Sequence, residues 1–111
     1  MGWMKHPIKI MNSEKAAAQL SELGYITRLE IYRLLVKSGK TGLPVSAIQD
    51  ALDVPGSTLS HHITRLMRVG LVKQKREGRV LRCQPQYHEL DKLIDFLKNE
   101  CCAQSDCCDR M

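Results

Sequence analysis

Five cysteines are the side chains of this sequence best suited to bind a soft ion or to undergo redox chemistry. Cys83 stands alone, whereas Cys101–Cys102 and Cys107–Cys108 form two adjacent pairs near the end of the chain. Thiolates bind trivalent arsenic, antimony and thiophilic metals far better than they bind magnesium or calcium. In a reducing compartment such thiols serve ligand binding or redox sensing more often than structural disulfides. We therefore expect the cysteines to carry a sensing function.

A second set of side chains could contact DNA. Leu59, Ile63, Leu66 and Met67 recur at the spacing of a helix with one buried face. The other face then carries hydroxyls and bases, which are Ser57, Thr58, Ser60, His61, Thr64 and Arg65. From a helix in a major groove, such groups reach phosphates and base edges. The pattern is typical of a recognition helix, although an isolated Ser/Thr cluster often only caps a helix. His62 falls nearer the apolar face and is expected to be a packed, hydrogen-bonded histidine.

A basic hairpin is predicted directly after this helix. Strands over 72–76 and 80–84 flank a tight turn at Gly78, where glycine allows a positive φ. The hairpin carries a group of cations expected to grip the DNA backbone, which are Lys73, Lys75, Arg76 and Arg79, with Arg82 further along. Lysines on an edge strand also guard against aggregation, which is the alternative reading of these charges.

The remaining elements position these two groups. Apolar residues at helical spacing predict helices over about 13–24, 27–38 and 45–52, the recognition helix over 57–68, and a last helix over about 87–101. Asn12 or Ser13 is the expected N-cap of the first helix. Residues 40–44 are predicted to form a loop. The fold class is mainly α with a two-stranded β-wing, a winged helix-turn-helix.

Length and composition fit one small globular domain. The chain has 111 residues, 43% of them hydrophobic, and a formal net charge of +5, which favours an anionic partner such as nucleic acid. We expect a flexible arm over 1–12, the folded domain over 13–101 and a cysteine-rich tail over 102–111. Because no apolar run could span a bilayer, we expect a cytoplasmic protein without a membrane partner. With no Cys-x-x-Cys, activated nucleophile or phosphate loop, an enzyme is not expected.

The order of these elements resembles the ArsR/SmtB family of winged-helix metalloregulatory repressors. The match rests on the segments 27–31, 57–63, 70–72 and 76–79, which read TRLEI, STLSHHI, GLV and REGR. The resemblance implies a homodimer whose first and last helices form the interface. It also implies two recognition helices in successive major grooves of a near-palindromic, double-stranded operator.

The resemblance also bears on the signal. Many members of the family bind metalloid through a Cys-x-Cys motif in the third helix, where this chain has Val45-Ser46-Ala47. The zinc site of the last helix would need two spaced histidines, which are missing here. The chain resembles the methylarsenite-responsive ArsR repressors, which implies a trivalent arsenical as inducer and no resident cofactor.

Helix geometry suggests which thiols meet. Cys101 extends the apolar stripe of the last helix, and about fourteen helical residues place it roughly 20 Å from Cys83 of the same chain. In an antiparallel crossing of the two last helices, Cys101 would instead approach Cys83 of the other subunit. Two thiols suit methylarsenite, and Cys102 as a third would admit arsenite or antimonite. A buried small side chain is the alternative role for Cys83.

The sequence therefore predicts an operator-binding repressor that an arsenical releases. A thiol-based redox sensor, or a sensor of another soft metal, is the alternative within the same family.

Overall fold

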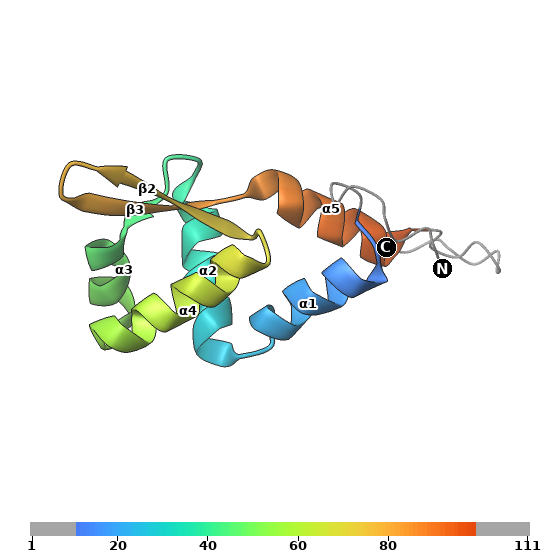
Figure 1. Ribbon diagram of the computed structural model, residues 1–111, viewed down its shortest axis with the longest axis horizontal. Coiled ribbons are helices and arrows are strands. Elements are labelled where there is room, and N and C mark those ends of the chain that lie inside the picture. Colours follow the sequence, from blue (N-terminus) through green and yellow to red (C-terminus); the bar gives the residue numbers. More distant parts are fainter. Residues whose placement is uncertain (1–10, 100–111) are drawn as a thin grey trace.

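The computed structural model describes residues 11–99, and these form five helices and three strands. Their order is α1 (Ser13–Leu23), α2 (Ile26–Ser38), β1 (Leu43–Pro44), α3 (Val45–Leu52), α4 (Gly56–Arg68), β2 (Val72–Glu77), β3 (Val80–Pro85) and α5 (Tyr87–Lys98). Figure 1 shows α3, α4 and the β2–β3 hairpin at one end of the molecule, with α1 and α5 at the other. The predicted winged helix-turn-helix is confirmed.

The sheet contains one strand more than the wing itself. β3 lies between β1 and β2, antiparallel to both, and Cys83 pairs with Leu43 on one side and Gln74 on the other. The prediction of a loop over 40–44 is therefore wrong for its last two residues. A strand of two residues is too short to show an alternation of polar and apolar side chains.

Local signals fix several element ends. The side chain of Asn12 accepts a hydrogen bond from the backbone N–H of Lys15, so Asn12 is the N-cap of α1. Gly78 has φ +66° at the wing turn, as predicted. α5 is described to Lys98, and its predicted extension to Cys101 lies outside the described residues, as do residues 1–10 of the predicted arm over 1–12 and the tail over 102–111.

A core of apolar side chains joins α2, α3, α4 and the sheet. Leu59, Ile63 and Leu66 of α4 are at most 1% exposed and pack with Ile31 and Leu35 of α2. Burial of each such side chain contributes roughly 1.5–3 kcal/mol. Met67, predicted to share this face, is 37% exposed. The buried stripe of α4 is therefore narrower than its sequence indicates.

A polar cluster ties α1 to α5. Gln19 is fully buried and donates to the carbonyl of Val69 and to Glu89 of α5, and Lys15 pairs with the same carboxylate at 3.0 Å. Burial alone would raise the pKa of Glu89, but the hydrogen bonds from Lys15 and Gln19 outweigh it, so the pKa is lowered. Glu89 of α5 is thus held as a carboxylate that faces α1.

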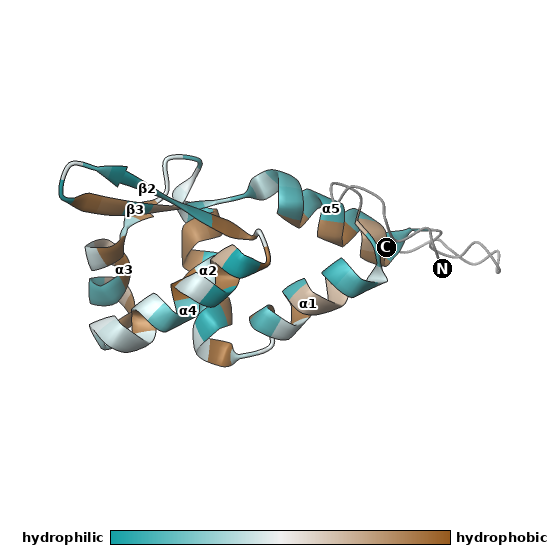
Figure 2. Ribbon diagram, in the orientation of Figure 1, coloured by the Kyte–Doolittle hydropathy of each residue, from teal (hydrophilic) through white to brown (hydrophobic). Residues whose placement is uncertain are grey.

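The terminal helices expose apolar side chains. Leu20 of α1 is 42% exposed, and Ile94 and Leu97 of α5 are 45% and 56% exposed. Figure 2 shows hydrophobic residues of α5 in brown between hydrophilic ones in teal. Among the described helices, none combines the length and the apolar character that crossing a bilayer needs.

The loop before β1 makes one close backbone contact. Gly42 has φ +74°, and a Cβ atom at this position would lie 1.9 Å from the carbonyl oxygen of Cys83. Only glycine fits this conformation and this space.

Candidate nucleic-acid interface

The outer face of α4 presents short polar side chains. The predicted contact residues of this face that are exposed are Ser57, Thr58, Ser60, His61 and Thr64. The helix starts after Pro55, and no side chain caps its N-terminus. The alternative that the hydroxyls serve as the helix cap is therefore not supported. They are available to an external partner.

The wing presents the cations. Lys73, Lys75, Arg76 and Arg79 are all exposed on β2 and its turn. Lys75 lies 4.0 Å from Glu77, and Arg82 donates to Glu77 at 3.1 Å. Such exposed pairs are weak, because water and salt screen them. The cations nearest the tip are thus well placed to meet phosphate.

The helix and the wing share one hollow. Its volume is about 400 Å³, and its lining includes Ser60 of α4, Gln74, Arg76 and Arg79 of the wing, and Ser46 at the start of α3. Residues predicted separately on the helix and on the hairpin therefore lie at one surface. Hydroxyl and guanidinium groups around one hollow suit a nucleic-acid backbone.

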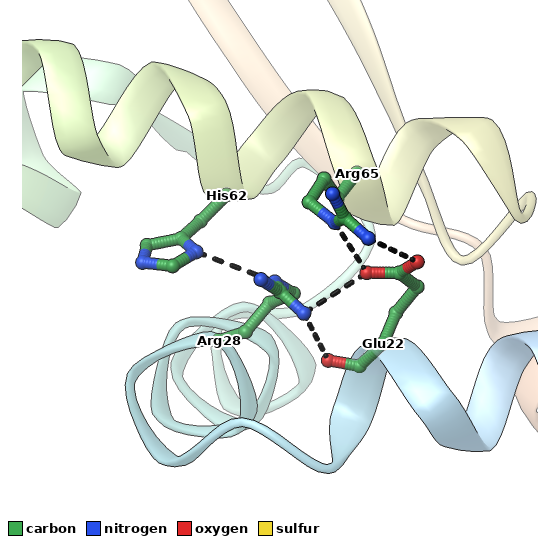
Figure 3. Close-up of polar contacts among 4 residues, drawn as sticks. All are labelled: Glu22, Arg28, His62 and Arg65. Carbon is green, nitrogen blue, oxygen red and sulfur yellow. Dashed lines mark hydrogen bonds and ion pairs between the residues drawn. The ribbon is translucent and has the colours of Figure 1, made fainter.

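Arg65 differs from the other predicted contact residues. Its Nε donates to Oε1 of Glu22 at 2.8 Å, and its Nη2 donates to Oε2 at 3.3 Å (Figure 3). Glu22 belongs to the last turn of α1, so the side chain of Arg65 points toward α1. The hydrogen bond from Arg65 is the main cause of the lowered pKa of Glu22.

Arg28 of α2 completes this cluster. The residue is 8% exposed, and its Nη1 donates to the carbonyl oxygen of Glu22 at 3.0 Å and to Oε1 at 2.9 Å. Its Nε donates to Nδ1 of His62 at 3.3 Å. The first two bonds satisfy a carbonyl and a carboxylate at the end of α1, where helix carbonyls lack partners. We call Glu22, Arg28, His62 and Arg65 the α1–α2–α4 cluster.

His62 is a packed, hydrogen-bonded histidine, as predicted. It is 5% exposed, and its ring centroid lies 5.2 Å from that of Tyr25. Because Nδ1 accepts from Arg28, the ring is neutral and carries its proton on Nε2. Burial, followed by the charge of Arg28, lowers the pKa of His62.

Sequence reasoning missed Glu22 and Arg28. Glu22 lies 43 residues before Arg65, and no local pattern connects the two positions. One signal was available for Arg28. It is a charged residue near the start of an apolar helix, three positions before Ile31 and therefore on the same face of that helix. Long charged side chains at such positions often end in a specific ion pair.

Of the predicted ligand thiols, Cys83 is the one that lies within the described residues. Cys83 is fully buried within the core cluster, and Nε2 of Gln74 lies 3.6 Å from its sulfur. Burial raises the pKa of the Cys83 thiol, and the contact with Gln74 opposes this only in part. Cys101 and Cys102 lie outside the described residues. Within residues 11–99, no three His, Cys, Asp or Glu side chains gather as a metal site would require.

Comparisons with known proteins agree with this geometry. A family model described as a helix-turn-helix domain matches residues 27–75. An uncharacterised helix-turn-helix-type transcriptional regulator of Methanocaldococcus jannaschii is 42% identical over 65 residues, which cover 59% of this chain and 71% of that protein.

Solved structures share the fold over more of the chain. An ArsR-like transcriptional regulator of Rhodococcus sp. RHA1 is 27% identical with a TM-score of 0.67, covering 77% of each chain. A homodimeric winged helix-turn-helix DNA-binding domain of Mycobacterium bovis, described as a possible ArsR-family regulator, is 25% identical with a TM-score of 0.61. That match covers 84% of this chain and 86% of the other.

Two observations on the structure agree with these relatives. The polar face of α4 is exposed, and the basic wing lies beside it. The chain belongs to the helix-turn-helix transcriptional regulators and is a DNA-binding regulator of the ArsR/SmtB type.

Proposed function

We propose that the chain is a repressor that binds its operator as a homodimer, with one α4 in each of two successive major grooves. The observation that carries this proposal is the hollow shared by Ser60, Arg76 and Arg79. A helix in the groove reads base edges, while cations of the wing bind the adjacent backbone. The exposed apolar residues Leu20, Ile94 and Leu97 support pairing through α1 and α5, as does the homodimeric relative.

Salt dependence of operator binding tests the proposed contacts. The measurement is fluorescence anisotropy on the duplex upstream of the gene, at several salt concentrations. Arg76→Gln and Arg79→Gln should each weaken binding and reduce the slope of log K against log salt by about 1. Arg33→Gln, at an exposed position of α2, removes the same charge away from the interface and is the control. Equal losses in all three variants would contradict the proposed surface.

We further propose that a trivalent arsenical releases the repressor by binding cysteine thiolates. The support is the sequence, in which four of the five cysteines lie beyond residue 100 and no third-helix site exists. Methylarsenite is the expected inducer, with arsenite and antimonite as alternatives. The burial and the raised pKa of Cys83 count against this thiol as a first point of attack. The proposal therefore depends chiefly on Cys101 and Cys102.

Release of preformed operator complex tests this step. Methylarsenite and arsenite are titrated under reducing conditions against Cys83→Ala, Cys101→Ser and Cys102→Ser. We expect Cys101→Ser to abolish release and Cys83→Ala to retain most of it. Unchanged release in both C-terminal variants would contradict an arsenical site at these thiols. Release by peroxide but not by arsenical would instead favour the redox sensor.

A further inference from the structure

We infer that Arg65 is a positioning residue for operator recognition, which acts through Glu22 rather than through a contact with DNA. This inference rests on the proposed function. Sequence reasoning placed Arg65 among the residues that face the groove, yet its two-pronged contact takes both carboxylate oxygens of Glu22 (Figure 3). A guanidinium held in this way has a fixed direction.

The surroundings of Glu22 oppose the transfer of Arg65 to a phosphate. The Glu22 side chain is 15% exposed, and its second cation, Arg28, has a side chain that is 10% exposed. If Arg65 left, a carboxylate largely withdrawn from water would keep a single cation. Such a carboxylate is costly when its pairing is incomplete. Arg76 and Arg79 of the wing, by contrast, are exposed and can turn to phosphate without breaking a comparable contact.

The α1–α2–α4 cluster also adds directional contacts, which the apolar packing of α4 lacks. Leu59, Ile63 and Leu66 hold the helix against the core, but apolar contacts have little directional preference. The bonds from Arg65 to Glu22 and from Arg28 to His62 are directional, and they attach one flank of α4 to both α1 and α2. These bonds fix the rotation of α4 about its own axis. That rotation decides whether Ser60, His61 and Thr64 face the bases.

A double-mutant cycle separates positioning from direct contact. Glu22→Gln, Arg65→Gln and the double variant are compared on operator and on an unrelated duplex of equal length. Positioning predicts that each single change lowers the ratio of operator to unrelated affinity by about tenfold, and that the double change lowers it no further. Glu30→Gln and Arg33→Gln, at exposed positions of α2, are the charge-matched controls. Additive losses would overturn the inference.

The salt slope gives a second readout, which separates positioning from a direct contact with phosphate. Arg65→Gln should keep the wild-type slope, whereas Arg79→Gln should reduce it by about 1. A reduction of about 1 in Arg65→Gln would overturn the inference and leave the proposed function standing. Absence of operator binding by the wild-type protein at every salt concentration would instead refute the proposed function.

Arg65→Lys keeps the test decisive if the glutamine variant unfolds. Lysine holds a phosphate as a point charge but cannot make the two-pronged contact with Glu22. Direct contact therefore predicts unchanged operator affinity, and positioning predicts a loss close to that of Glu22→Gln. Circular dichroism confirms that each variant is folded before binding is compared.

Discussion

Glu22 and Glu77 each pair with two cations, Glu22 where α1 meets α2 and α4, and Glu77 on the wing. Glu22 pairs with Arg28 and Arg65, and its side chain is 15% exposed. Glu77 pairs with Lys75 and Arg82, and its side chain is 44% exposed. The composition of the two groups is nearly the same. Because the Glu77 carboxylate is better hydrated, its pairs are weaker than those of Glu22 and leave the exposed Lys75 available to DNA.

The largest effect is expected from removing the buried cation. Arg28→Met should destabilise the protein by about 2–4 kcal/mol, because the carbonyl and carboxylate of Glu22 and Nδ1 of His62 all lose a donor. Urea unfolding followed by circular dichroism measures the change. Arg33→Met, at an exposed position of the same helix, should stay within about 0.5 kcal/mol. Similar losses of stability in Arg28→Met and Arg33→Met would contradict a structural role for the buried Arg28.

Acid should lower the stability that the α1–α2–α4 cluster contributes, by less than Arg28→Met does. The pKa of His62 is lowered in the folded protein, so the unfolded chain takes up a proton first as the pH falls below about 6.5. The stability from neutral His62 is present above that pH and is lost as the pH falls through the folded pKa. The charged groups around the ring are Arg28, His61 and Arg65.

The thermal midpoint measures this loss. Between pH 7 and pH 5 we expect the thermal midpoint of the wild-type protein to decrease. His62→Gln should flatten this part of the curve, and substitution of the exposed neighbour, His61→Gln, should not. The lowered pKa of Glu22 adds a separate loss only below about pH 4.5. A wild-type midpoint independent of pH from 7 to 5 would show that His62 is not coupled to folding.

The smallest effect on stability is expected at the wing. Glu77→Gln should change the free energy of unfolding by less than about 0.5 kcal/mol, because the Glu77 carboxylate and Lys75 are solvated. The same change removes a negative charge beside Arg76 and should raise DNA affinity at low salt. Thermal unfolding and anisotropy on one preparation measure both quantities. A marked loss of stability would mean that the wing pair is structural.

Much of the fold could be predicted because its signals are local. Asn12 caps α1, Gly78 allows the wing turn, and the spacing of Leu59, Ile63 and Leu66 marks the buried face of α4. Each of these features depends on neighbours within a few residues. The short strand Leu43–Pro44 depends instead on pairing with β3, which lies some forty positions further along the chain.

The site was predictable only in part for the same reason. The exposure of Thr64 and the burial of His62 follow from their positions on one helix. The partner of Arg65 comes from another helix, so its side chain was assigned to the groove without knowledge of Glu22. Cys83 illustrates the same limit, because the alternation of a strand gives its face but not the depth of the core beneath it.

The backbone contact at Gly42 limits which residues can stand in the loop before β1, next to β3. A saturation library at position 42 should return glycine alone, since any larger residue would separate β3 from its loop. Gly78 has a similar φ of +66° but open space around it, so asparagine or aspartate should survive there. Two glycines of one hairpin region would thus diverge, one invariant and one exchangeable.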